Sequence, residues 1–285
     1  MNHIHWYPGH IAKAERQLKE RLNLVDVIIE VLDARIPYSS RYKTVNKLCP
    51  NKPRLILMNK SDVADDNFTK IWAKIIEHET NCRVLATNLS KKSDIKLITN
   101  MVTELSDDIM KKRVSKGLLP RPVRTMVIGI PNVGKSSTIN RLVGRAKTKT
   151  GAKAGVTREQ QWVRISDKIE LLDTPGIIPT VQDDQKQALK LAMVNSIGEN
   201  AYEAEFVAEE LLKILEKYYP DALKNYYNLN ESDIIALNTI GLKRNWILKP
   251  DVADIKRTSL VILSNFRDGK IGKISLERPE EYGLI

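Results

Sequence analysis

The chain has 285 residues, of which 42% are hydrophobic and 28% charged, a composition typical of one large globular domain or two ordinary ones. No apolar run approaches the roughly 20 residues needed to cross a bilayer, and the start lacks the features of a signal peptide. Cys49 and Cys82 have neither disulfide nor metal-binding spacing. We therefore expect a monomeric cytoplasmic protein with reduced thiols and no membrane partner.

The net charge of +11 is unevenly distributed along the chain. Residues 1–184 contain 32 lysines and arginines against 20 acidic residues, whereas residues 185–285 contain 14 against 15. A basic surface attracts polyanions and binds nucleic acids through their phosphates. The charge therefore favours RNA or DNA as a partner, and a merely solubilising excess of charge is the alternative.

The first 180 residues alternate apolar strands with helical stretches, which is typical of an α/β fold. Near-continuous apolar runs predict buried, mostly parallel strands with helices on both faces of the sheet. Strands are expected at 25–32, 54–58, 83–87 and 125–130, with a hairpin at 162–173. Helical spacing occurs at 11–22, 68–79 and 94–112.

The second part of the chain is predicted to be helical. Residues 111–124 contain six basic residues, no acid and two prolines, which indicates a linker between two blocks of the sheet. Beyond Pro179 the expected strands stop, and amphipathic helices are expected at 187–197, 205–219, 231–240 and 254–266. We therefore predict a nucleotide-binding domain at 1–180 and a separate all-α domain at 181–285.

A phosphate-binding motif follows the strand expected at 125–130. Residues 129–136, GIPNVGKS, match G-x-x-x-x-G-K-[ST], and a helix is expected directly after them. Backbone N–H groups of such a loop surround the phosphates, the lysine neutralises their oxygens, and the serine hydroxyl binds magnesium. The predicted phosphate-binding residues are Gly129, Asn132, Val133, Gly134, Lys135, Ser136 and Ser137.

Two later segments complete a predicted nucleotide switch. The sequence Asp173-Thr174-Pro175-Gly176 lies about forty residues beyond Lys135, where a magnesium-linked aspartate and a γ-phosphate-sensing glycine are expected. Thr157, in the basic stretch between the two motifs, is the predicted second magnesium ligand. That stretch also fits a simple exposed loop, or a loop that contacts the phosphates of RNA.

Residues Asn59-Lys60-Ser61-Asp62 match N-K-x-D and end the strand expected at 54–58. The Asp62 carboxylate can accept hydrogen bonds from the ring N–H and the exocyclic amine of guanine, a donor pair that adenine lacks. Asn59 is expected to hold the loop and the Lys60 stem to lie over the base. A last guanine contact is predicted after the next strand, from Asn88, Leu89 and Ser90.

The guanine-reading motif comes before the phosphate loop, the reverse of the usual order. The binding edge of a parallel sheet is assembled from loops in space, so their order along the chain is not constrained. Joining the usual last strand to the usual first one, through residues 111–124, leaves the same site. The sequence therefore predicts a circularly permuted P-loop GTPase domain.

Five segments of the chain are distinctive in sequence and in order: HWYPGHIAKA (5–14), DARIPYSSR (33–41), GIPNVGKSS (129–137), GVTREQQW (155–162) and LLDTPGI (171–177). Together they resemble the ribosome biogenesis GTPase A family, also called YlqF/RbgA. The resemblance runs from residue 4 through the helical tail, and the family's glycines after the last guanine loop are replaced here by Lys92 and Asp94.

The resemblance implies slow hydrolysis of GTP to GDP with magnesium, stimulated by a precursor of the large ribosomal subunit. Its implied partners are the rRNA and proteins of that particle, with the helical domain binding RNA. It further implies that Asn132 binds a potassium ion, which supplies the charge of an arginine finger.

The residue after Gly176 is Ile177, which cannot orient a water as the glutamine of many GTPases does. The resemblance assigns catalysis to His10, since a neutral imidazole can accept a proton; from the residues alone, His10 starts a helix and packs locally. The predicted catalytic residues are His10, Lys135, Thr157 and Gly176.

A second function from another class remains compatible with the sequence. In this alternative the protein is an RNA-binding assembly scaffold, GTP is a structural ligand, and turnover is incidental. Ile177 favours it, because the usual water-positioning side chain is missing. A metabolic P-loop kinase has no support, because no motif for a phosphate acceptor is visible.

Overall fold

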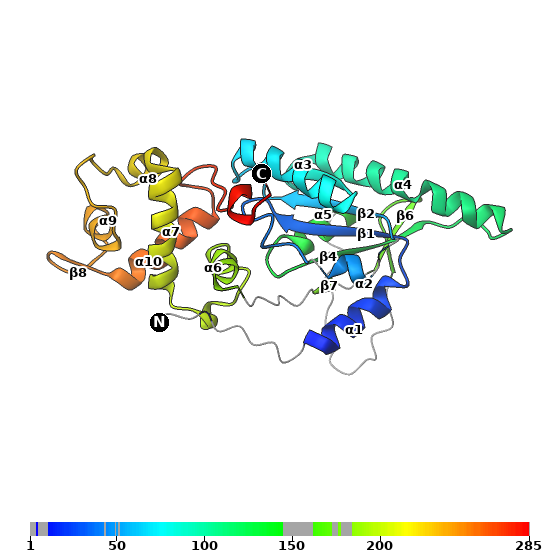
Figure 1. The fold of residues 1–285 in the computed structure, drawn as a ribbon, viewed down its shortest axis with the longest axis horizontal. Coiled ribbons are helices and arrows are strands. Elements are labelled where there is room, and N and C mark those ends of the chain that lie inside the picture. The colour runs from blue at the N-terminus through cyan, green and yellow to red at the C-terminus, as the bar shows by residue number, and fades with distance from the viewer. Residues whose placement is uncertain are drawn as a thin grey trace.

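The structure, a computed structural model, describes residues 4, 11–42, 44–48, 50, 52–144, 162–172, 176–177 and 184–284. A seven-stranded sheet forms its centre, with strand order β3-β2-β1-β4-β6-β5 and β7 paired to β4 (Figure 1). All pairings in it are parallel except the β5–β6 hairpin. The strands are β1 Val27–Asp33, β2 Arg54–Asn59, β3 Arg83–Thr87, β4 Val123–Gly129, β5 Trp162–Arg164, β6 Ile169–Leu172 and β7 Gly176–Ile177.

Helices cover both faces of this sheet, because its central strands are apolar on both sides. Every residue of β1 and β2 is buried. Helix α3 (Asp66–Thr80) packs Trp72 and Ile76 against Ile56, while helix α4 (Lys92–Ser115) packs Ile98 in the cluster that contains Leu55. Neighbouring residues of a strand point to opposite faces, so α3 and α4 cover opposite sides.

Three further helices belong to this part of the chain: α1 Ile11–Leu22, α2 Val45–Leu48 and α5 Lys135–Val143. The expected strands, the hairpin and the helices α1, α3 and α4 are therefore confirmed to within a few residues. Strand β4, which leads into the phosphate loop, lies in one sheet with β2 and β3, whose following loops carry the predicted guanine contacts and which precede β4 in the chain; the permuted order is therefore also confirmed.

The second part of the chain is mainly helical and lies at one end of the sheet (Figure 1). Its helices are α6 Gln185–Met193, α7 Ala204–Tyr218, α8 Pro220–Tyr227, α9 Leu237–Lys243 and α10 Ile255–Arg267, with short 3-10 turns at Glu199–Ala201 and Pro279–Tyr282. Helices α7 and α10 pack together through buried Leu211, Leu215, Ile262 and Phe266. Among the described residues, no helix has the length and hydropathy required to cross a membrane.

Several details of the second part differ from the sequence prediction, which also lacked helix α8. The helix expected at 231–240 begins only at Leu237, and a two-stranded hairpin, β8 Ile247–Lys249 with β9 Val252–Ala253, follows it. Its strands of three and two residues are too short to show a periodic pattern. The chain end also returns to the sheet and lies beside α3 (Figure 1). The boundary at 180/181 stays a prediction.

The join between the two blocks of the sheet is anchored at the edge opposite the nucleotide motifs. Helix α4 continues to Ser115 and extends past the sheet, so only residues 116–122 form a true connection (Figure 1). Asp26 receives both guanidinium nitrogens of Arg121, at 2.7 and 3.0 Å, and the backbone N–H of Arg124 at 2.8 Å. A single carboxylate thus fixes where the join enters β4.

We expect Asp26→Ala to lower the free energy of unfolding by about 2 kcal/mol, because it removes a partly buried bidentate pair and a backbone hydrogen bond. Denaturant titration measures this. Glu104→Ala is the control, since the Arg83–Glu104 pair is more than half exposed and its loss should cost under about 0.5 kcal/mol. Equal effects of the two changes would contradict the anchoring role of Asp26.

Candidate nucleotide-binding site

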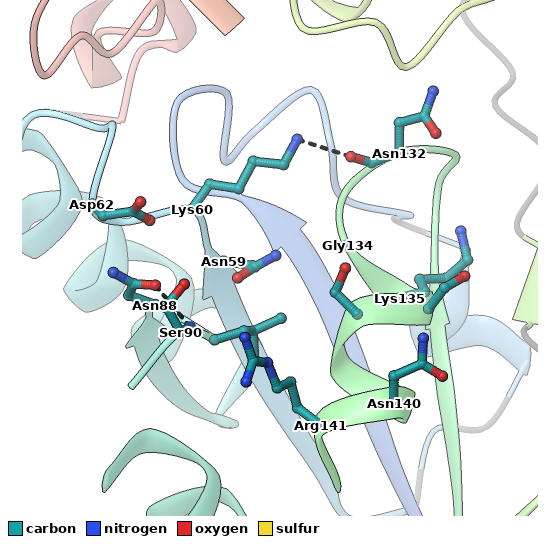
Figure 2. A pocket seen from close by; sticks show the side chains of 13 residues that line it. Asn59, Lys60, Asp62, Asn88, Ser90, Asn132, Gly134, Lys135, Asn140 and Arg141 are labelled. Atoms are coloured by element: carbon teal, nitrogen blue, oxygen red, sulfur yellow. Dashed lines mark hydrogen bonds between the residues drawn. The ribbon is translucent and has the colours of Figure 1, made fainter. Parts of the chain in front are cut away.

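A cavity of about 600 Å³ opens at the carboxyl ends of β2, β3 and β4. This is the edge where parallel α/β sheets bind their ligands. The lining residues come from the two sequence motifs, from the loop after β3 and from helix α5 (Figure 2): Asn59, Lys60, Asp62, Asn88, Leu89, Ser90, Asn132, Gly134, Lys135, Ser136, Ser137, Asn140 and Arg141.

The phosphate loop turns sharply into helix α5, and two glycines permit this. Gly129 has φ +154° and Gly134 has φ +107°. A Cβ on Gly134 would lie 2.1 Å from Asn59 Nδ2, and one on Gly129 would lie 2.6 Å from the carbonyl oxygen of Val31. A side chain is therefore excluded at these two positions, and backbone N–H groups at the start of α5 can approach an anion closely.

Lys135 lines the cavity, and among the residues that the structure describes no carboxylate pairs with it. The residue is 8% exposed, and its Nζ donates a hydrogen bond to the carbonyl oxygen of Ile130 at 2.6 Å. Burial lowers the pKa of Lys135 to about 8. A buried ammonium held by a neutral acceptor favours an anionic ligand, and phosphate oxygens fit this requirement.

The guanine-reading motif lies across the cavity from Lys135 (Figure 2). Asn59 donates through Nδ2 to the carbonyl oxygen of Val133 at 2.8 Å, which ties this loop to the phosphate loop. Asp62 is exposed to the cavity, so its carboxylate can accept hydrogen bonds from a base. One ligand in this cavity can therefore face Asp62 with one end and Lys135 with the other.

Lys60 joins three parts of the site. Its Nζ donates to Asp33 Oδ2 at 2.9 Å and to the carbonyl oxygen of Asn132, in the phosphate loop, at 2.8 Å (Figure 2). Asp33 is fully buried at the end of β1. Burial opposes ionisation of Asp33, but Arg35 and Lys60 outweigh it and hold the pKa of this carboxyl below its usual range. Lys60 is thereby held by a fixed negative charge.

The loop after β3 is held in place by Asp94. Asp94 Oδ2 accepts from the backbone N–H of Asn88 at 2.8 Å, and Asn88 Oδ1 accepts from the backbone N–H of Ser90 at 2.9 Å. These short-range bonds hold the loop at the cavity wall. The structure thus places Asn88, Leu89 and Ser90 beside the guanine-reading motif, as the sequence predicts.

Some predicted residues are less completely described. Gly176 pairs with Ile128 of β4, next to the start of the phosphate loop. His10, Thr157 and Asp173 lie outside the described residues, so their predicted roles have no geometry here. Asn132 Nδ2 donates to the carbonyl oxygen of Asn195, beyond α6, at 2.6 Å.

Two residues in the cavity were missed by sequence reasoning. Asn140 and Arg141 lie one helical turn beyond Ser136 and Ser137 on α5, and both line the cavity. The spacing of four residues, which brings side chains to one face of a helix, is the signal that identifies them.

Comparisons with known proteins agree with this geometry. Residues 124–239 match the family described as "50S ribosome-binding GTPase". The chain is 41% identical to ribosome biogenesis GTPase A of Bacillus cereus, with 98% of this chain and 95% of the relative aligned. It is 31% identical to the Thermotoga maritima protein of the same name over 97% of this chain and 95% of the relative.

Two solved structures are similar to this chain over nearly its whole length. The GDP-bound structure of YlqF superimposes with a TM-score of 0.66 at 27% identity, covering 93% of this chain and all of the other. GNP-bound YlqF from T. maritima gives 0.65 at 28% identity, covering 94% and 99%. The chain is 41% identical to a ribosome biogenesis GTPase A over nearly its whole length, and its phosphate loop and guanine-reading motif lie in one cavity. The chain therefore belongs to the ribosome biogenesis GTPase A family.

Proposed function

We propose that this protein binds and hydrolyses GTP as an assembly factor for the large ribosomal subunit, and that the precursor particle stimulates its turnover. The single observation that carries the proposal is the cavity that contains both Asp62 and Lys135. An ATP-binding protein gains nothing from a carboxylate at the position of Asp62, because adenine offers no donor pair to it. The family relationship supports the ribosomal part.

GTP would lie with its base against Asp62 and the loop Asn88–Ser90, and with its phosphates on residues 129–137. Lys135 would neutralise the β- and γ-phosphate oxygens. Ser136, Thr157 and Asp173 would hold magnesium, which would neutralise phosphate charge, and the exposed hydroxyl of Ser136 at the start of α5 fits such a ligand. Asn132 would hold potassium, through the amide oxygen that its bond to Asn195 leaves available.

Hydrolysis requires a group that orients the attacking water. Ile177 follows Gly176 in β7 and has no polar atom on its side chain. We assign the role to His10, with Gly176 N–H sensing the γ-phosphate. The same Ile177 supports the alternative function, an RNA-binding scaffold with incidental turnover.

The proposed RNA contacts divide between the two parts of the chain. Residues 181–285 are the proposed RNA-binding domain, yet the net positive charge of the chain lies in residues 1–184. We infer that the GTPase half supplies much of the phosphate contact. Binding of the whole protein to precursor rRNA should therefore weaken steeply with added salt.

Asp62→Asn should weaken GDP binding by at least about 100-fold, because the carboxylate that accepts two guanine hydrogen bonds is lost. The same change should improve binding of xanthosine diphosphate, whose carbonyl oxygen at position 2 can accept from the new amide. Calorimetric titration of both nucleotides measures this. Asp108→Asn, on the exposed face of α4, is the control. Unchanged GDP affinity in Asp62→Asn would show that another residue reads the base.

The affinity for GDP should depend on the protonation of Lys135. A bound phosphate raises the pKa of this ammonium above the value of about 8 in the free protein. The charged Lys135 side chain therefore contributes fully to GDP affinity below about pH 8. Above that pH the affinity falls by up to about tenfold per pH unit. Titrations between about pH 7 and 9 measure the decline. Lys135→Arg is the control, because a guanidinium keeps its charge and should flatten the profile.

His10→Ala should abolish stimulation of single-turnover GTP hydrolysis by the large-subunit precursor, while GDP affinity changes by less than about twofold, since the lost imidazole acts on water and not on the nucleotide. Stimulation that survives in this variant removes His10 from the mechanism. Hydrolysis by the unaltered protein that does not respond to the precursor would favour the scaffold.

A further inference from the structure

The guanine-reading loop is held from behind by the C-terminal segment, residues 269–278. The backbone N–H of Ile274 donates to the carbonyl oxygen of Val63 at 3.0 Å, and Val63 directly follows Asp62. The backbone N–H of Asp65 donates to Ser275 Oγ at 3.2 Å. The loop thus lies between the phosphate loop on one side and a segment about 210 residues later in the chain on the other.

Arg35 connects the same loop to helix α10. It is 1% exposed, and its Nε and Nη2 donate to the two oxygens of Asp33 at 2.9 and 2.8 Å. Its Nη1 donates to the carbonyl oxygen of Arg267, the last residue of α10, at 3.2 Å. Because Asp33 also holds Lys60, these contacts run from the guanine-reading motif to the helical part.

Glu277 fixes the segment onto the loop that follows β1. Its buried carboxylate accepts from the backbone N–H groups of Tyr38, at 2.7 Å, and Ser39, at 3.1 Å, and from the Ser39 hydroxyl. The neighbouring backbone N–H of Leu276 donates to the carbonyl oxygen of Arg35 at 2.8 Å. A charged acceptor that receives several donors in the interior holds its partners strongly.

Gly269 brings the end of α10 into direct contact with the guanine-reading loop. Its φ is +70°, and a Cβ built on it would lie 2.4 Å from Val63 Cγ1 and 3.0 Å from Val63 Cβ. A methyl group at this position would have to displace Val63, next to Asp62. Gly283 has a similar φ, +65°, but a Cβ there would meet nothing within 4 Å.

We propose that Gly269, Arg35 and Glu277 are positioning residues for base recognition, and that through them the C-terminal segment aligns the Asp62 carboxylate with guanine. The inference rests on the proposed binding of GTP in this cavity. It gives the helical part a connection to the base. A particle that shifts α10 would thereby change how tightly the guanine base is held.

The test compares GDP with inosine diphosphate, which lacks the exocyclic amine that Asp62 recognises. The unaltered protein should prefer GDP by about tenfold or more. Gly269→Ala should reduce this preference at least about threefold, mainly by weakening GDP binding. Gly283→Ala, with matched backbone strain and open space around it, should leave the preference unchanged. A purely structural effect would weaken both nucleotides equally and keep their ratio.

Three further variants make the result decisive. Val63→Ala combined with Gly269→Ala removes Val63 Cγ1, the nearer of the two clashing atoms, and should restore part of the preference. Glu277→Gln should reduce the preference, while Arg54→Gln should not, because it breaks the buried Arg54–Glu30 pair near the opposite edge of the sheet. Thermal unfolding of each variant verifies that it is folded.

The outcomes distinguish failure of the proposed function from failure of the positioning role. An unaltered protein without preference for GDP would overturn the proposed function itself. An unaltered protein that prefers GDP, with a Gly269→Ala variant that keeps the full preference, would overturn only the positioning role. Should Gly269→Ala fail to fold, the Glu277→Gln and Arg54→Gln pair decides the question alone.

Discussion

The site depends on one buried carboxylate, that of Asp33. An ion with no exposed surface is costly to bury, and here the cost is offset by the bidentate Arg35 and by Lys60. Removing one partner of such a group typically costs about 3–5 kcal/mol, because the remaining charge is uncompensated. Through Lys60 the carboxylate reaches the phosphate loop at Asn132, and through Arg35 it reaches the end of α10. Three regions distant in the chain are thus joined at one charge.

The position of the cavity at one edge of the sheet explains why circular permutation leaves the site intact. The cavity is built from loops at the carboxyl ends of neighbouring parallel strands, and the bond from Asn59 to Val133 joins two of them across the sheet. The new connection, residues 116–122, enters β4 at its other end, where Asp26 anchors it. Chain order is therefore altered at one edge of the sheet while the ligand would bind at the other.

The helical part contacts the loops around the nucleotide site directly, through side-chain and backbone hydrogen bonds. Arg267 donates to the carbonyl oxygens of Met193 and Ala192 at the end of α6, and its own carbonyl oxygen accepts from Arg35. The C-terminal segment then continues behind the guanine-reading loop. Under the proposed function, contacts of this kind would couple a ribosomal particle bound to the helical part to the base side of the cavity.

The sequence by itself determined strands β1–β6, most helices, the phosphate-loop motif from Gly129 to Ser136 and the N-K-x-D motif Asn59–Asp62, because each depends on local spacing. The order of the two motifs along the chain also predicted the permutation. Only the tertiary structure decided the contacts of Asp33, Arg35 and Glu277, the return of the chain end, and the place of Asn140 and Arg141 in the cavity. Several of these contacts join residues more than 200 positions apart, such as Tyr38 and Glu277, and such pairs leave no periodic trace in the sequence.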